Sequence, residues 1–286
     1  MARVAIFTDS ASDLEPADAA AAGVRVVPLI VSFGSDSYRT GVDLTTQEFW
    51  ARMTAADAPF PTTAASSPGD FREAYEAAFA EGAEAIVSIH VASTLSGTIK
   101  SARIAREMLP DREIHIVDSL GASMAQTILA RMAVAMAAEG TPAAQIAAAL
   151  DRRVPDLRIY VALETLEYLR KGGRISGARA AIGTLLSVKP IISVEQGVVD
   201  TVDRVRTRSK ARERLIELIC AHPIEQIEIL HTLTPDVEAF RDEVVARATG
   251  SFDRSDVKIG LVGASVGPHL GPGCLGAAVL YEAGSV

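Results

Sequence analysis

Short apolar runs rich in β-branched residues alternate with helical patterns along the first half of the chain. The predicted strands are Val4–Phe7, Arg25–Val31, Ala85–Val91 and Ile114–Val117, and the predicted helices are Glu15–Ala22, Thr46–Met53, Pro68–Ala80, Thr98–Met108, Ala122–Ala138 and Pro142–Arg152. Strands that alternate with helices are typical of a mostly parallel sheet covered on both faces. We therefore expect an N-terminal α/β domain.

A domain boundary is expected near Pro155, because proline disfavours helical backbone at the residue before it. Beyond it the predicted strands are Arg158–Leu163, Ile191–Val194, Val198–Val205, Glu225–His231, Val257–Val262 and Leu275–Tyr281, and the predicted helices are Glu164–Lys171, Ala178–Leu186, Arg208–Cys220 and Pro235–Ala248. The short link between Val194 and Val198 cannot hold a parallel crossover, so these two strands should form an antiparallel hairpin. The prediction is two α/β domains, 1–155 and 156–286, the second with a mixed sheet.

Composition agrees with a globular protein of two domains. The 286 residues exceed the ~100–200 of a single domain, and 49% are hydrophobic against 22% charged. Cys220 and Cys274 lie far apart, which indicates neither a disulfide framework nor a zinc site and favours the reducing cytoplasm. The N-terminus reads directly as a strand without signal-peptide features, and no apolar run reaches the ~18–20 residues that span a bilayer.

Basic residues concentrate in one segment of an acidic chain. The net charge of −8 argues against a general nucleic-acid binder, yet residues 166–214 hold 11 Lys or Arg against 5 Asp or Glu. In this segment, basic residues recur at a spacing of two, which on a strand would place them on one face: Arg204, Arg206, Arg208, Lys210, Arg212 and Arg214. Such a face is either a solvated guard of a sheet edge or the contact surface for an acidic or phosphorylated partner.

Polar loops follow several predicted strands, where ligands bind in open α/β sheets. In the loop Thr8–Leu14, Asp9 and Ser10 are expected to organise the loop ends. The loops Pro61–Pro68 and Ser93–Thr98 each run into a helix and carry hydroxyl groups. Each loop alone is explained by helix capping, but free amides and hydroxyls at two helix starts together predict a shared anion pocket.

A fourth loop, Gly263–Gly273, carries His269 among many glycines and prolines, which should prevent any regular element and hold the imidazole in place. A lone histidine is usually structural. At a fixed position, its simplest further role is to donate a hydrogen bond to an anion or to a hydroxyl that touches it.

The same loop contains a G-x-S-x-G pattern around Ser265, which raises a serine hydrolase as the alternative. That motif requires a helix after the serine and a distant acidic residue and histidine. Here Pro268 should block the helix, and His269 follows after only four residues with no acid between. A serine hydrolase, or another small-molecule enzyme using Ser265 or Ser96, stays open as the disfavoured alternative. No metal-binding or P-loop pattern occurs in the sequence.

Seven ordered motifs together resemble the DegV family, which includes the fatty-acid-binding subunits of bacterial fatty acid kinase. They are Thr8–Leu14, Pro61–Pro68, Leu95–Ala102, Val117–Ser119, Leu166–Ser176, Lys189–Ile191 and Gly267–Gly276. The resemblance implies two α/β domains with a fatty acid between them. It also implies a carrier without catalytic residues, cofactor or metal.

The resemblance assigns roles to particular residues. Thr63, Ser96 and the Gly97 amide would contact the carboxylate, and His269 would complete the hydrogen-bond network. The supporting loops would be held by Asp9, Ser10 and Thr62. A separate ATP-dependent kinase, which phosphorylates the bound acid to acyl phosphate, would dock at Arg170, Lys171, Arg174, Arg204 and Arg206. Transient membrane contact would allow lipid exchange.

Two positions depart from the family pattern. Ala64, Ala65 and Ser66 follow Thr63 where the family usually has Ser-x-Pro, and Pro268 precedes His269 in place of a small polar residue. These differences affect the fine contacts of the head group rather than the expected pocket.

Overall fold

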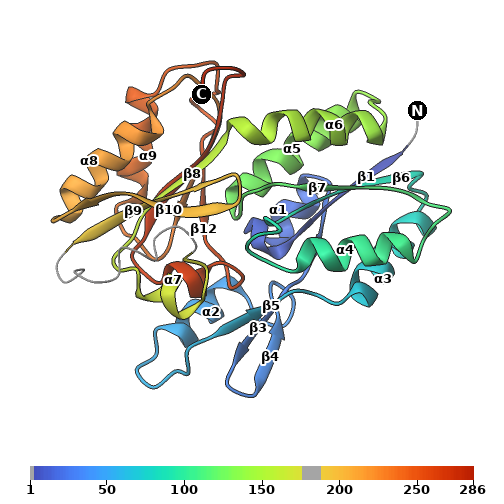
Figure 1. The fold of residues 1–286 in the computed structure, drawn as a ribbon, viewed down its shortest axis with the longest axis horizontal. Helices are drawn as coiled ribbons and strands as arrows, with labels where there is room; N and C mark the ends of the chain where they lie inside the picture. Colours follow the sequence, from blue (N-terminus) through green and yellow to red (C-terminus); the bar gives the residue numbers. More distant parts are fainter. Residues whose placement is uncertain (1–2, 176–187) are drawn as a thin grey trace.

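The computed structural model describes residues 3–175 and 188–286, and its first sheet is parallel (Figure 1). Four strands lie in the order β2-β1-β6-β7, with bounds β1 (Val4–Asp9), β2 (Val24–Val27), β6 (Ala85–His90) and β7 (Glu113–Asp118). Each neighbouring pair is parallel. The predicted parallel N-terminal sheet is confirmed.

Helices cover both faces of this sheet. One apolar cluster joins the sheet to α3 (Pro68–Ala80) and α4 (Thr98–Glu107), and contains Phe7 and Ile86. In each strand, the neighbouring residue points to the opposite face of the sheet. Ile6 and Val87 therefore pack in a second apolar cluster, together with α5 (Met124–Ala138) and α6 (Ala143–Arg153). This alternation follows from the two-residue period of a strand. The remaining N-terminal helical elements are η1 (Ser10–Ser12), α1 (Pro16–Ala21), α2 (Thr46–Met53) and η2 (Val154–Asp156).

A small antiparallel sheet, which the sequence did not predict, lies beside the first. Its order is β4-β3-β5, with bounds β3 (Ile30–Phe33), β4 (Asp36–Arg39) and β5 (Thr62–Ala64). The prediction of one continuous strand over Arg25–Val31 was therefore wrong. The chain leaves the first sheet after Val27 and enters the small sheet at Ile30, because Pro28 lacks the amide that a continuing ladder requires.

The second large sheet is mixed, as predicted, and has the order β10-β9-β8-β13-β11-β12. Its strands are β8 (Leu157–Ala162), β9 (Lys189–Glu195), β10 (Val198–Val205), β11 (Ile224–His231), β12 (Lys258–Leu261) and β13 (Leu275–Tyr281). The antiparallel β9–β10 hairpin is confirmed, and β11 and β12 pair in parallel. The helices of this half are α7 (Glu167–Lys171), α8 (Arg208–Ile219), α9 (Val237–Arg247) and α10 (Gly267–Leu270), while the predicted helix Ala178–Leu186 lies outside the described residues.

The basic row beginning at Arg204 does not share one strand face, so that prediction was wrong. Strand β10 ends at Val205, and Thr207 caps α8 by accepting a hydrogen bond from the Lys210 amide. Lys210 and the arginines that follow therefore lie on a helix. Arg208 donates a hydrogen bond to Asp236 at 3.0 Å, so part of the row serves to join α8 to the start of α9.

The loop that carries His269 contains a short helix, contrary to the prediction of an irregular loop. Helix α10 spans Gly267–Leu270, and Pro268 lies in its first turn. Proline is compatible with this position because the first amides of a helix have no intrahelical acceptor.

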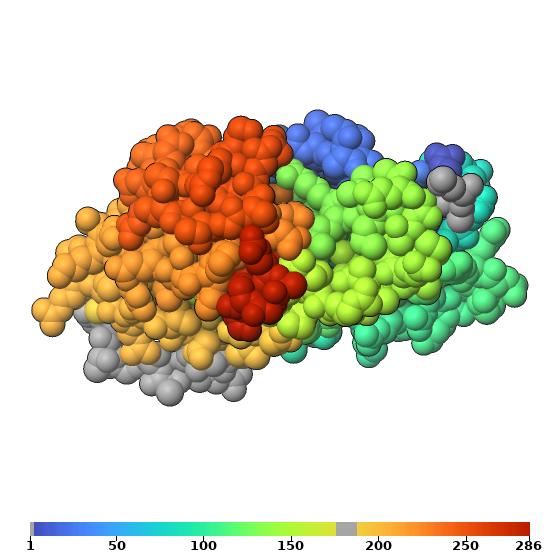
Figure 2. Space-filling model, turned by 90° about the horizontal axis from the view of Figure 1, so that it is seen from above, coloured from blue at the N-terminus to red at the C-terminus, as the bar shows by residue number. Residues whose placement is uncertain are grey.

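Helix α5 lies between the two large sheets and contacts both (Figure 1), and the two halves of the chain lie directly against each other in Figure 2. Its residues 124–130 are all buried, as expected for a helix packed on more than one side. Contact is close where α5 meets β12: a Cβ on Gly260 would lie 1.9 Å from Cε of Met124. The division into two domains at residue 155 stays a prediction.

Candidate functional site

An apolar cavity of about 140 Å³ lies between the first sheet, the small sheet and the β9–β10 hairpin. Its walls combine aliphatic side chains from both halves of the chain, namely Ala11, Leu29, Val91, Leu95, Ile192, Val194, Val199 and Leu270. Polar groups line it as well, from Thr63, Ser96, Gly97, Arg174, Ser265 and His269. The four residues predicted to contact a carboxylate are thus brought together, although they come from three segments of the sequence.

Thr63 and His269 form the central polar contact of this cavity. Thr63 lies on β5 and His269 on α10, and the distance from Thr63 Oγ1 to His269 Nε2 is 3.1 Å. Burial, and secondarily the charge of Arg174, lowers the pKa of His269 to about 4, so the imidazole is neutral at pH 7. With the proton on Nε2, the imidazole donates to Thr63 and leaves the threonine hydroxyl proton free to donate to an anion.

The position of the imidazole depends on the absence of a side chain at Gly172. A Cβ built on Gly172 would lie 2.1 Å from Nδ1 of His269 and 2.8 Å from its Cε1. Nδ1 is buried and has no hydrogen-bond partner among the described residues. The ring is therefore held by packing against the end of α7 on one side and by Thr63 on the other.

Ser96 and Gly97 supply the second polar group, in the loop between β6 and α4. Ser96 Oγ lies 2.8 Å from Thr98 Oγ1 and accepts a hydrogen bond from the Thr98 amide at 3.3 Å. Gly97 is the N-cap of α4 and has φ −74°, a backbone conformation that any residue can adopt. No atom of the described residues lies within 4 Å of the position that its Cβ would occupy, which leaves the backbone open to a ligand.

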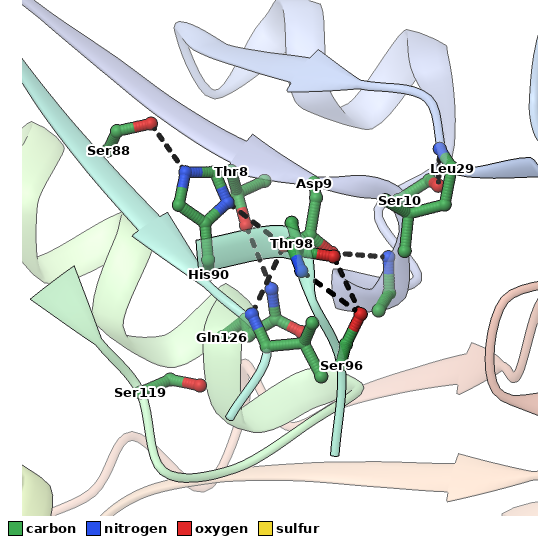
Figure 3. Close-up of polar contacts among 12 residues, drawn as sticks. Thr8, Asp9, Ser10, Leu29, Ser88, His90, Ser96, Thr98, Ser119 and Gln126 are labelled. Atoms are coloured by element: carbon green, nitrogen blue, oxygen red, sulfur yellow. Dashed lines mark hydrogen bonds and ion pairs between the residues drawn. The ribbon is translucent and has the colours of Figure 1, made fainter. Parts of the chain in front are cut away.

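Asp9 joins two segments of the cavity wall through the polar contacts drawn in Figure 3. Its side chain is completely buried at the end of β1 and accepts hydrogen bonds from the amides of Ala11 and Val91, at 2.9 and 3.1 Å. His90 Nδ1 lies 2.9 Å from the same carboxylate. Because Ala11 and Val91 both line the cavity, the predicted supporting role of Asp9 agrees with this geometry.

The network continues away from the cavity through residues that sequence reasoning missed. His90 Nε2 lies 2.7 Å from Ser88 Oγ, and the hydroxyl of Tyr75 donates to Ser88 at 2.8 Å. The order Asp9–His90–Ser88 resembles a catalytic triad, but all three side chains are completely buried, so no substrate reaches them. The sequence does contain one indication of this network: Ser88 and His90 are polar residues two positions apart on an otherwise apolar strand.

Three hydroxyl groups, those of Ser10, Thr40 and Ser265, lie together beside the cavity. Ser10 Oγ lies 3.0 Å from Ser265 Oγ and accepts a hydrogen bond from the Leu29 amide at 2.8 Å. Thr40 Oγ1 lies 3.3 Å from Ser265 Oγ. Among the described residues, neither Ser265 nor Ser96 forms a hydrogen bond with a histidine, whereas an activated serine nucleophile usually lies beside such a base.

Thr62, predicted to support the loop, does not line the cavity. It lies on β5, pairs with Ser32 and is exposed, since successive residues of a strand point to opposite faces. Its supporting role stays a prediction.

The basic residues assigned to partner docking lie on two elements. Arg170 and Lys171 form the exposed last turn of α7, where Lys171 pairs with Glu167 at 2.8 Å. Arg204 is exposed on β10, an edge strand of the mixed sheet, and Arg206 follows it. Arg174 instead lines the cavity. The docking role itself stays a prediction.

Within residues 3–175 and 188–286, no group of three or more His, Cys, Asp or Glu side chains is arranged to hold a metal ion. None of the helices there is both long and apolar enough to cross a membrane.

The fold and the cavity define a class of α/β proteins in which a mostly apolar ligand site lies between a parallel sheet and a mixed sheet. The family model described as "Uncharacterised protein, DegV family" matches residues 3–282. The chain belongs to the DegV family, which confirms the resemblance found in the sequence.

Relatives match over nearly the whole chain. A DegV domain-containing protein of Deinococcus radiodurans is 35% identical over 96% of this chain and 98% of its own length. The corresponding protein of Streptomyces coelicolor is 34% identical, with the same coverage.

Solved structures with the same fold include proteins that bind fatty acids. The structure of a fatty-acid-binding DegV family protein from Thermus thermophilus has a TM-score of 0.88 at 33% identity, covering 98% of this chain and 100% of that one. A stearic-acid-binding protein from Eubacterium ventriosum has a TM-score of 0.85 at 27% identity, covering 98% of each chain.

Proposed function

We propose that this protein binds a long-chain fatty acid in the cavity between its sheets and presents the carboxylate to a separate ATP-dependent kinase. The observation that carries the proposal is the cavity itself: mostly aliphatic walls with Thr63, His269, Ser96 and Gly97 lining it. The fatty-acid-binding structures of relatives support the same ligand class.

The polar groups suit a carboxylate that must remain reactive. Thr63 and Ser96 offer hydroxyl donors and Gly97 an amide, while the neutral His269 adds no positive charge. Hydrogen bonds from neutral donors hold a carboxylate less strongly than bidentate ion pairs, so its oxygen stays able to attack phosphorus. Affinity comes instead from the acyl chain, at ~0.8 kcal/mol for each buried methylene.

The kinase step balances without a catalytic group on this chain. A carboxylate oxygen forms a bond to the γ-phosphorus of ATP, the bond from that phosphorus to the β-phosphate oxygen breaks, and ADP leaves with the electron pair. The products are acyl phosphate and ADP. We assign the kinase contact to the exposed Arg170, Lys171, Arg204 and Arg206, with Arg174 at the cavity. We place the protein in the cytoplasm, with transient membrane contact for lipid exchange.

Native mass spectrometry tests the proposal. The purified protein should carry an added mass equal to that of a long-chain fatty acid, and the double variant Thr63→Ala, Ser96→Ala should lose it. The matched control is Thr62→Ala, Ser93→Ala, which removes neighbouring exposed hydroxyls and should keep the ligand. A wild-type protein that binds no fatty acid even when palmitate is supplied would overturn the proposal.

A further inference from the structure

A second hollow, of about 230 Å³, lies beside α1, and we call it the α1 pocket. Its walls come from α1, β2, residues 40–46 and the turn at Gly263 and Ala264, and most of them are aliphatic. Val42, which lines it, is 61% exposed, so the pocket opens to solvent. An apolar cavity of ~150 Å³ accepts benzene, so this pocket has room for a somewhat larger molecule of about nine or ten heavy atoms.

The α1 pocket is separate from the fatty acid cavity. In the described chain, the two hollows share no lining residue. Ser10 and Thr40 line the pocket and Ser265 lines the cavity, with Ser10 Oγ 3.0 Å from Ser265 Oγ. The backbone of Leu29 holds this partition, because its amide donates to Ser10 at 2.8 Å and its carbonyl oxygen accepts from Thr40 at 3.1 Å. A ligand can therefore occupy the pocket while the cavity is filled.

The α1 pocket is acidic. Asp13 and Glu15 line it, and no Lys, Arg or His does so among the described residues. Asp13 Oδ1 accepts a hydrogen bond from the Gly263 amide at 2.8 Å, and Oδ2 accepts one from the Ser123 hydroxyl. Burial, and to a smaller extent the nearby carboxylates of Glu15 and Asp9, raises the pKa of Asp13 to about 7.

Basic side chains near Asp13 are engaged elsewhere. Arg131 and Lys258 line a neighbouring hollow that also includes Asp13. Arg131 pairs with the buried Glu228 at 2.7 Å, and Lys258 pairs with Asp256. Within the part of the chain that the structure describes, Asp13 is therefore a desolvated carboxylate without the cationic partner that such groups normally have.

A second polar group of the pocket also has no partner. Thr46, the first residue of α2, is 9% exposed, and its hydroxyl forms no hydrogen bond with any described residue. Thr46 Oγ1 and Asp13 Oδ1 lie 3.3 and 3.2 Å from the position that a Cβ on Gly263 would occupy. The glycine thus leaves both oxygens uncovered at one place in the pocket wall, where a single donor group can reach them.

We propose that the α1 pocket binds a small primary amine with a compact apolar body, whose ammonium group pairs with Asp13 and donates a hydrogen bond to Thr46. An ammonium group has three donors and no acceptor, which matches two oxygens that can accept. The carboxylates of Asp13 and Glu15 disfavour an anion, and the aliphatic wall disfavours a polyamine. This site does not depend on the proposed fatty acid function.

Isothermal titration calorimetry with 2-phenylethylamine, in the presence and absence of palmitate, tests the proposal. We expect the amine to bind in both cases, because palmitate occupies a different cavity. 2-Phenylethanol, in which a neutral hydroxyl replaces the ammonium group, should bind at least about ten-fold more weakly, since it loses the charge-assisted hydrogen bond. Phenylacetate, an anion of similar size, should not bind.

Two variants locate the amine. Asp13→Asn keeps the size of the side chain and should lower the amine affinity at least about ten-fold while palmitate affinity stays unchanged. Ala20→Leu adds a larger side chain at an exposed position of the pocket wall and should block the amine, which keeps the test decisive if Asp13→Asn does not fold. Asp18→Asn is the matched control, because Asp18 is an exposed acidic residue of α1 that does not line the pocket.

The outcomes separate this site from the fatty acid cavity. Wild-type protein that does not bind 2-phenylethylamine at millimolar concentration overturns the amine site, as does an amine affinity that neither Asp13→Asn nor Ala20→Leu lowers. Equal affinities for the amine and the alcohol contradict the ion pair, and amine that palmitate displaces lies in the wrong cavity. Amine binding by a protein that does not bind palmitate overturns the carrier proposal alone.

Discussion

Gly172→Ala should displace His269 from Thr63 and weaken fatty acid binding without unfolding the protein. The added Cβ would lie 2.1 Å from Nδ1 of the imidazole, 2.8 Å from Cε1 and 3.2 Å from Cγ. The backbone of Gly172 has φ −74° at the end of α7, which alanine adopts without strain. The substitution therefore acts on the histidine ring rather than on the chain.

The size of the expected loss in palmitate affinity follows from the hydrogen bond between His269 and Thr63 that the substitution removes. A hydrogen bond to a neutral partner contributes ~1 kcal/mol, and a misplaced polar group adds about as much again. A total of ~1–2 kcal/mol corresponds to an affinity for palmitate about 5- to 30-fold lower. Stability should change little, because alanine is favoured over glycine in helical backbone by up to ~1 kcal/mol, which offsets part of the repacking cost.

Gly173→Ala is the matched control, one residue further along. Gly173 has φ +69°, and no described atom lies within 4 Å of its Cβ position. Alanine there should cost ~1–2 kcal/mol of stability through backbone strain and leave palmitate affinity unchanged. Calorimetric titration and urea unfolding of both variants measure the two effects. If Gly172→Ala binds palmitate like the wild type, the imidazole does not position the head-group site as described.

Three further predictions concern stability and the disfavoured hydrolase alternative. Arg131→Met should lower the free energy of unfolding, measured with urea at pH 8, by ~3 kcal/mol, because it leaves the buried Glu228 without its partner at 2.7 Å. The control Arg241→Met loses an ion pair with the exposed Asp242 and should lower it by less than ~0.5 kcal/mol. Burial raises the pKa of Glu228 to about 7, so the stability that its protonated form contributes is fully present below about pH 4 and is lost as pH rises through 7. Glu228→Gln should flatten this fall in the free energy of unfolding with pH. An unchanged pH profile would contradict the raised pKa of Glu228. Ser265→Ala should leave any ester hydrolysis of the preparation unchanged, measured with p-nitrophenyl butyrate.

Much of the fold could be predicted where local signals were strong. Helices α2 and α3 have the bounds predicted for them, because each begins with a capping box, at Thr45 and Ser67. Strand Arg25–Val31 was misjudged since an apolar run hides the point where the chain changes sheets, although Pro28 marked it. The basic row was misjudged because a spacing of two describes a strand only up to Val205.

The site was predictable only in part, for a physical reason. Hydroxyls and glycines in loops indicate an anion pocket, but pairing Thr63 with His269 requires the tertiary arrangement of β5 and α10, which local patterns do not contain. The network around Asp9 arises because β1 and β6 pair in parallel with Thr8 beside Ile89. Register of this kind brings Asp9 and His90 together across a sequence separation that no short motif spans.

The central claim is that Thr63, Ser96 and their neighbours hold a fatty acid carboxylate. Carbon-13 NMR of carboxyl-labelled palmitate bound to the protein tests it most directly. We predict one bound carboxyl resonance, distinct from those of free and micellar palmitate, that shifts in Thr63→Ala and in Ser96→Ala but not in Thr62→Ala. A resonance that matches micellar palmitate, or that none of these substitutions moves, would contradict the claim.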